Sequence, residues 1–110
     1  MGAKPSPNRT SKPAARAALG PSRATLTAWA AEHGVELIFL DPPEQFDHAI
    51  VGLIEGFNQE PAVLYDTAVV LAALAEDLGD LEAADEWFEF NTIGAYLGPA
   101  TPRFLFRPAR

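Results

Sequence analysis

The chain has 110 residues, of which 48% are hydrophobic, with 15 acidic side chains, 8 basic side chains and no cysteine. This length fits one domain with a modest core. A chain without cysteine has no disulfide, no thiol nucleophile and none of the common structural zinc sites. Its apolar runs are much shorter than the roughly 20 residues of a membrane-spanning helix, so we expect no membrane partner.

The net charge of −7 is distributed unevenly along the chain. Residues 24–102 contain all 15 acids and neither lysine nor arginine. Soluble domains usually mix both signs of charge on their surface. An acidic segment of this length therefore predicts either a solubility feature, neutralised by the basic ends, or a surface that binds a basic partner. The bases are Lys4, Arg9, Lys12, Arg16, Arg23, Arg103, Arg107 and Arg110.

Residues 1–21 are rich in proline, alanine and basic side chains and offer little to bury, so we expect a disordered basic arm. Residues 22–107 are expected to form a single acidic domain. Ser22 is a suitable N-cap for a helix that ends at Gly34. Residues 35–40 are β-branched and aromatic in character and predict a strand, which the following prolines end.

The next segments predict a helical turn over residues 44–48 and a hairpin of two strands, residues 50–55 and 61–65. Asp66 and Asp80 are suitable N-caps for helices over residues 67–78 and 81 to about 90, and Gly79 separates the two. Residues 91–99 break the helical pattern, and residues 103–107 predict a last strand. This order indicates an α+β fold with a small, mainly antiparallel sheet packed against two or three helices.

The second long helix carries like charges at a spacing of four residues and no base that could offset them. Each such pair costs about 0.2–0.5 kcal/mol in an isolated helix. The acids form either a solvated face or a recognition surface for a basic partner, opposite a stripe of Leu81, Ala84, Trp87 and Phe88 that we expect to be buried. The candidate partner-binding residues are Asp77, Asp80, Glu82, Asp85, Glu86 and Glu89.

Known catalytic and ligand-binding motifs do not occur in this sequence. The chain has neither a Walker loop nor a G-x-G-x-x-G motif. Residues 77–82 do not match a calcium loop, and two histidines make a poor metal site, so we expect no metal and no cofactor. Direct binding of nucleic acid is not expected, because the acidic domain would repel phosphates.

Three blocks of sequence carry a resemblance to a known set of proteins. They are FDHAIVG at 46–52, the pair Tyr65-Asp66, and FNTIGAYLGPATPRF at 90–104. Together they resemble small uncharacterised phage and prophage proteins with the pattern FD-x-A-I-x-G … YD … F-N-x-x-G-A-x-x-G-x-x-T-P-x-F. The resemblance implies a cytoplasmic protein of a mobile element and does not imply a reaction.

The polar side chains of these blocks have two interpretations. They either fix loop geometry through hydrogen bonds to the backbone, or converge as a polar pocket. The candidate pocket residues are Asp47, Tyr65, Asp66, Asn91, Tyr96 and Thr101.

We therefore expect a non-catalytic interaction protein, such as a phage-type inhibitor or accessory factor. Its acidic helix would bind the basic surface of a host protein, for example a nuclease or a DNA-binding complex. The alternative is a small-ligand-binding domain or enzyme that uses the pocket around Asp47, Tyr65, Asp66 and Asn91. The sequence leaves open whether the chain self-associates.

Overall fold

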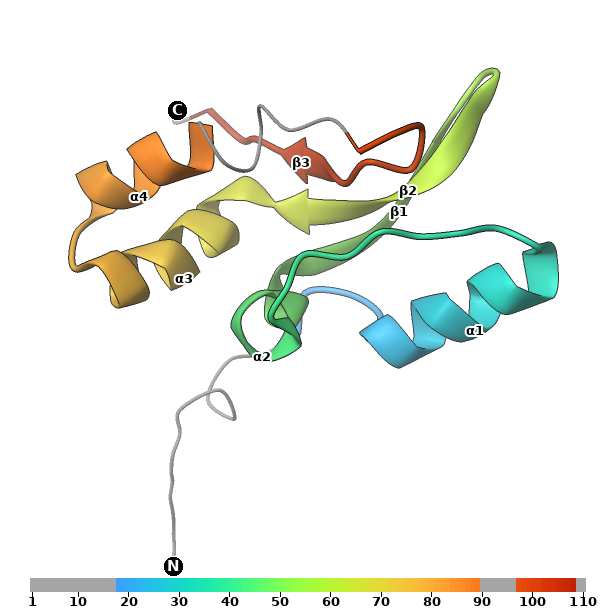
Figure 1. Ribbon diagram of the computed structural model, residues 1–110, viewed down its shortest axis with the longest axis horizontal. Coiled ribbons are helices and arrows are strands. Elements are labelled where there is room, and N and C mark those ends of the chain that lie inside the picture. The colour runs from blue at the N-terminus through green and yellow to red at the C-terminus, as the bar shows by residue number, and fades with distance from the viewer. Residues whose placement is uncertain (1–17, 90–96, 109–110) are drawn as a thin grey trace, which may run out of the picture.

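The computed structural model describes residues 18–89 and 97–108 (Figure 1). In this part of the chain, four α-helices, one short 3₁₀-helix and a three-stranded sheet form the predicted α+β fold. The elements in chain order are α1 (Arg23–His33), α2 (Pro43–Phe46), η3 (Asp47–Ala49), β1 (Ile50–Gly56), β2 (Gln59–Asp66), α3 (Thr67–Leu78), α4 (Leu81–Phe88) and β3 (Arg103–Leu105).

The longer helices begin at the residues that the sequence predicts, and α1 and α3 also end there, whereas α4 ends at Phe88 rather than near residue 90. Ser22, Asp66 and Asp80 each accept a hydrogen bond from the backbone N–H three residues later, at the starts of α1, α3 and α4. Gly34 and Gly79 follow α1 and α3 with left-handed backbone angles, φ 66° and 97°, which glycine adopts without steric cost. These caps fix the angle between α3 and α4, which are separated by only two residues.

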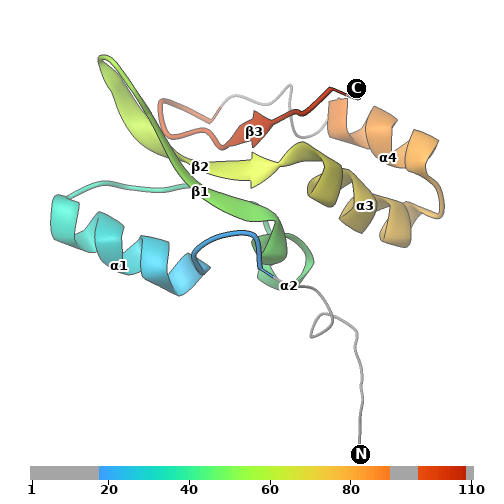
Figure 2. The same cartoon turned by 180° about the vertical axis from the view of Figure 1, so that it is seen from behind.

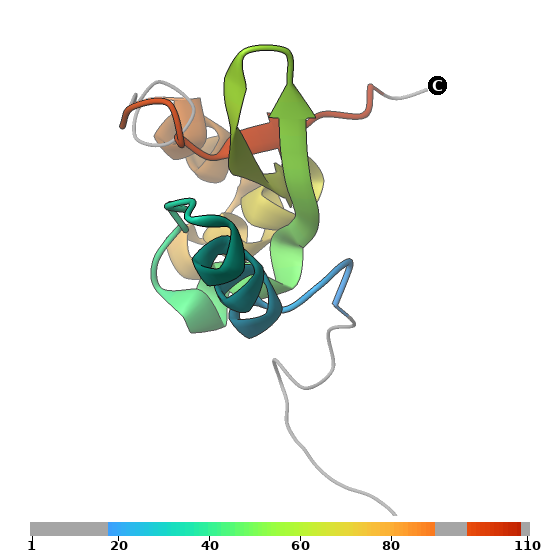
Figure 3. The same cartoon turned by 90° about the vertical axis from the view of Figure 1, so that its right-hand side faces the viewer.

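The sheet has the strand order β1-β2-β3. β1 and β2 form the predicted antiparallel hairpin, with Asn58 in the left-handed region at its turn (φ 57°). β3 pairs in parallel with residues 64–66, the last part of β2. The sheet is therefore mainly antiparallel, as expected. The tip of the hairpin projects beyond β3 (Figure 1 and Figure 3).

The strand predicted for residues 35–40 is not formed, and this segment is irregular. Side chains bond the backbone of Leu40 in place of a neighbouring strand: its N–H donates to Tyr65 Oη at 2.8 Å, and its carbonyl accepts from Arg23 Nη2 at 2.8 Å. Leu37 and Phe39 pack against the core. The apolar composition thus reflects packing on the core rather than strand pairing.

One core cluster joins the sheet to α1, α3 and α4. Leu26 of α1 is buried, and so is Phe88 of α4. Phe88 meets Phe104 of β3 edge to face, with ring centroids 5.0 Å apart, a favourable aromatic geometry. In the views of Figure 1 and Figure 2, α1 and the α3–α4 pair lie toward opposite ends of the molecule.

The predicted basic arm lies mostly outside the described residues, which include only positions 18–21 of it. Here Gly20 packs so closely on β1 that a Cβ atom would overlap the carbonyl oxygen of Val51. Among the helices of residues 18–89 and 97–108, none is long and apolar enough to cross a membrane.

Candidate interaction surface

The acidic residues of α4 share one side of the helix. Their spacing of three, four and seven residues places them on one face, and all are exposed. The buried residues of the same helix, Ala84 and Phe88, lie on the face that packs on the core. The acids on α4 and directly after it are Glu82, Asp85, Glu86 and Glu89.

Two further exposed acids lie near the turn between α3 and α4. Asp77 is exposed near the end of α3. Asp80 is exposed as well, and its Oδ1 accepts a hydrogen bond of 2.7 Å from the N–H of Ala83. Asp80 therefore also begins α4, where a negative charge is favoured by the helix dipole. We call these residues the acidic surface: Asp77, Asp80, Glu82, Asp85, Glu86 and Glu89.

Exposed apolar side chains adjoin the acidic surface. Leu78 and Leu81, on either side of the α3–α4 turn, are 41% and 60% exposed, and Trp87 of α4 is 40% exposed. The expectation that Leu81 and Trp87 are buried is wrong, because α4 packs on the core mainly through Ala84 and Phe88. Helical periodicity alone did not separate the residues that reach the core from their neighbours. Apolar anchors beside charged groups are typical of protein interfaces.

The described arginines make their contacts away from α4. Arg23 pairs with Asp47, and Arg107 pairs with Asp66. Arg103 donates to a side-chain amide oxygen in β2 at 3.1 Å. These three bases therefore bond to other parts of the molecule rather than to the acidic surface.

Two candidate pocket residues meet around Arg23. Nε of Arg23 lies 3.1 Å from both carboxylate oxygens of Asp47. Tyr65 is fully buried, and its hydroxyl oxygen accepts the N–H of Leu40, whose carbonyl bonds to Arg23. Burial raises the pKa of Tyr65 from 10.0 to about 12. With the further contacts of Arg23 to Phe39 and Asp41, this arrangement holds residues 39–41 in place.

The other described pocket residues lie in separate local networks. Asp66 is buried, caps α3 through Val69 and pairs with Arg107. Thr101 Oγ1 accepts the N–H of Leu97 and donates to the carbonyl of Gly98, which closes a tight turn. Asn91 and Tyr96 lie outside the described residues. The contacts of the described members are those of helix caps and loop anchors.

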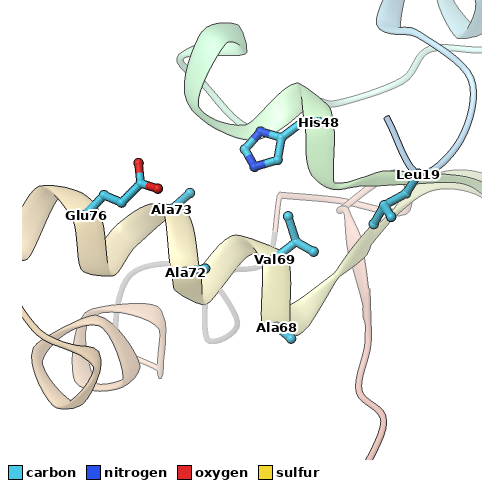
Figure 4. A pocket seen from close by; sticks show the side chains of 7 residues that line it. All are labelled: Leu19, His48, Ala68, Val69, Ala72, Ala73 and Glu76. Carbon is cyan, nitrogen blue, oxygen red and sulfur yellow. The ribbon is translucent and has the colours of Figure 1, made fainter. Parts of the chain in front are cut away.

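A shallow groove of about 320 Å³ runs between α3, η3 and the start of the described chain (Figure 4). It is mainly apolar, with one imidazole and one carboxylate in its lining. In the part of the chain that the structure describes, no three acidic or histidine side chains are grouped to hold a metal ion. The groove residues are Leu19, His48, Ala68, Val69, Ala72, Ala73 and Glu76.

Comparisons of the chain with protein-family profiles, with curated proteins and with solved structures found no match.

Proposed function

We propose that this protein acts by binding the basic surface of another protein through its acidic surface. The observation that carries the proposal is the placement of the α4 acids on one exposed helix face, opposite Ala84 and Phe88, which attach the helix to the core. A field of one sign increases the rate at which an oppositely charged partner associates. The adjoining Leu81 and Trp87 supply apolar contact area, which carries much of the affinity of protein interfaces.

The partner class that fits this surface best is a nucleic-acid-binding protein, such as a nuclease or a DNA-binding complex. The grooves of such proteins bind rows of phosphates through lysine and arginine side chains, and a row of carboxylates on a helix offers the same sign of charge. The phage-type resemblance of the sequence supports a host protein as the target and the cytoplasm as the compartment. In this proposal the protein inhibits or assists its partner by stoichiometric binding.

Retention of host proteins on the immobilised 110-residue chain tests this proposal. Bound proteins would be released first by salt and, in a second column, by duplex DNA at low salt, and then identified by mass spectrometry. We expect a nucleic-acid-binding protein that both treatments release, because salt screens exposed charges and DNA occupies the same groove. A partner that neither salt nor DNA releases would contradict the proposal.

A further inference from the structure

The groove along α3 has small side chains on the helix and a charged residue at one end. Ala72 and Ala73 lie along the helix, Leu19 lies near the start of α3, and Glu76 lies toward its end (Figure 4). Ala72 is exposed. Small side chains leave room for an extended segment of chain to lie against the helix.

The start of the described chain lies at this groove. Leu19 is part of the lining, and Gly20 is held against β1, where a Cβ atom would overlap the Val51 carbonyl oxygen. The residues before position 18 are therefore attached to the domain beside the groove. Their attachment point gives this segment a high effective concentration there.

The charge and length of the preceding segment match the groove and its surroundings. Residues 1–17 contain Lys4, Arg9, Lys12 and Arg16 and no acid, whereas the groove ends at Glu76, with Asp77 next to it. Seventeen extended residues span up to about 56–61 Å, and the 12 residues of α3 span about 18 Å. The segment is long enough to follow the groove and to reach the acidic surface.

We propose that residues 1–17 bind in cis along the α3 groove. We expect the alanines of this segment to lie over the small side chains of α3 and its basic residues to lie toward the acidic end of the helix. The proposal does not rest on the proposed function, because its test needs no partner. Where both hold, the bound segment places positive charge at the edge of the acidic surface and competes with the basic partner.

Paramagnetic broadening in the 110-residue chain tests this proposal. The chain has no cysteine, so Ser11→Cys provides a single attachment site for a nitroxide label. We expect the label to broaden the amide signals of Ala72 and Glu76 and to leave those of Phe57 and Asn58, at the hairpin tip, unchanged. Uniform or absent broadening would overturn the proposal. Broadening in a mixture of labelled unenriched chain and unlabelled enriched chain would show that a second copy occupies the groove, which would also overturn it.

A matched pair of variants on the labelled chain separates docking from nonspecific proximity. Ala72→Lys places a positive charge in the groove, and Ala28→Lys places the same charge on an exposed position of α1. We expect Ala72→Lys to abolish the broadening of Glu76 and Ala28→Lys to retain it. Both positions are exposed, so both variants should fold, which the spread of the amide signals verifies. Broadening that survives Ala72→Lys unchanged would contradict the proposed site.

Discussion

The guanidinium of Arg23 contacts both carboxylate oxygens of Asp47 through Nε, at 3.1 Å each. The same side chain donates to the Leu40 carbonyl at 2.8 Å and lies over the Phe39 ring, 4.4 Å from its centroid. Arg23 therefore ties α1 to η3 and to the irregular segment between them. Together with Tyr65, whose hydroxyl oxygen accepts the Leu40 N–H, Arg23 replaces the hydrogen bonds that a neighbouring strand would provide at this residue.

Replacing Arg23 should destabilise the fold. Arg23→Gln leaves the partly buried Asp47 without its cation and the Leu40 carbonyl without its donor, so we expect a loss of about 1–3 kcal/mol in the free energy of unfolding. Urea denaturation measures this. The control is Asp41→Asn, whose carboxylate is 76% exposed and 3.6 Å from Arg23, and for which we expect less than about 1 kcal/mol. Equal losses in the two variants would show that the contact between Arg23 and Asp47 stabilises the fold no more than the exposed contact between Arg23 and Asp41.

The buried hydroxyl of Tyr65 should make stability fall in alkali. Its pKa in the folded chain is about 12, against 10.0 for an ordinary tyrosine. The unfolded chain therefore loses this proton first. The contribution to stability is complete below pH 10 and is lost as the pH rises from 10 to about 12, by roughly 2–3 kcal/mol in all.

Tyr65→Phe is the control for this pH dependence. It removes the titrating group, so the part of the alkaline loss that comes from Tyr65 should disappear. At neutral pH the variant should be less stable by about 1–3 kcal/mol, because the Leu40 N–H loses its acceptor. Urea denaturation across the alkaline range measures both effects, and an unchanged alkaline loss in the variant would refute the assignment.

The pair of Asp66 and Arg107 should hold the C-terminal segment against α3. Asp66 is 2% exposed and its other oxygen caps the helix. Arg107→Gln leaves this carboxylate buried without a cation, and we expect a loss of about 3 kcal/mol. Arg103→Gln, at an exposed hydrogen bond in β3, should cost less than about 1 kcal/mol. Thermal unfolding distinguishes the two, and the reverse order would contradict the structural role of Asp66.

Gly20→Ala should loosen the start of the chain from β1. The added methyl group overlaps the backbone carbonyl of Val51, which cannot move without disturbing β1. We expect faster hydrogen exchange at the Val51 amide and a loss of about 1–3 kcal/mol, typical of overpacking. Gly34→Ala tests a different cause, because its Cβ meets open space and only its left-handed backbone is strained. Unchanged exchange at Val51 in Gly20→Ala would show that this close approach is not maintained.

The local signals of the sequence predicted most of the elements. Ser22, Asp66 and Asp80 begin helices, and Gly34 and Gly79 end them, because capping depends on residues within one helical turn. The prediction of a strand over residues 35–40 was wrong because the hydrogen-bond partners of this segment are distant in the sequence. Its backbone partners are Tyr65 Oη and Arg23, and a contact with Tyr65, 25 residues away, leaves no mark on a local pattern.

The candidate site could be predicted only in part, because some of its features depend on contacts between segments that are far apart in the sequence. The shared face of the α4 acids follows from helical spacing alone. The exposure of Leu81 and Trp87 depends on how α4 rests on Phe104 of β3, and the parallel pairing of β3 with β2 depends on the path of the whole chain. The groove along α3 joins three segments far apart in the sequence, so no pattern of neighbours could indicate it.

Charge reversal on α4 tests whether the acidic surface binds the partner. In Glu86→Lys with Glu89→Lys, the like-charged pairs Glu82–Glu86 and Asp85–Glu89 become opposite-charged pairs at a spacing of four, which stabilises a helix by about 0.2–0.5 kcal/mol per pair. The control, Glu36→Lys with Glu60→Lys, makes the same change in net charge at exposed positions outside α4.

The measurement is the affinity of each variant for the captured partner, beside its free energy of unfolding. We expect the α4 variant to fold at least as stably as the wild type and to lose binding by ten-fold or more, the equivalent of about 1.4 kcal/mol. The control variant should retain binding. An equal loss in both variants, or full binding by the α4 variant, would contradict the proposed function.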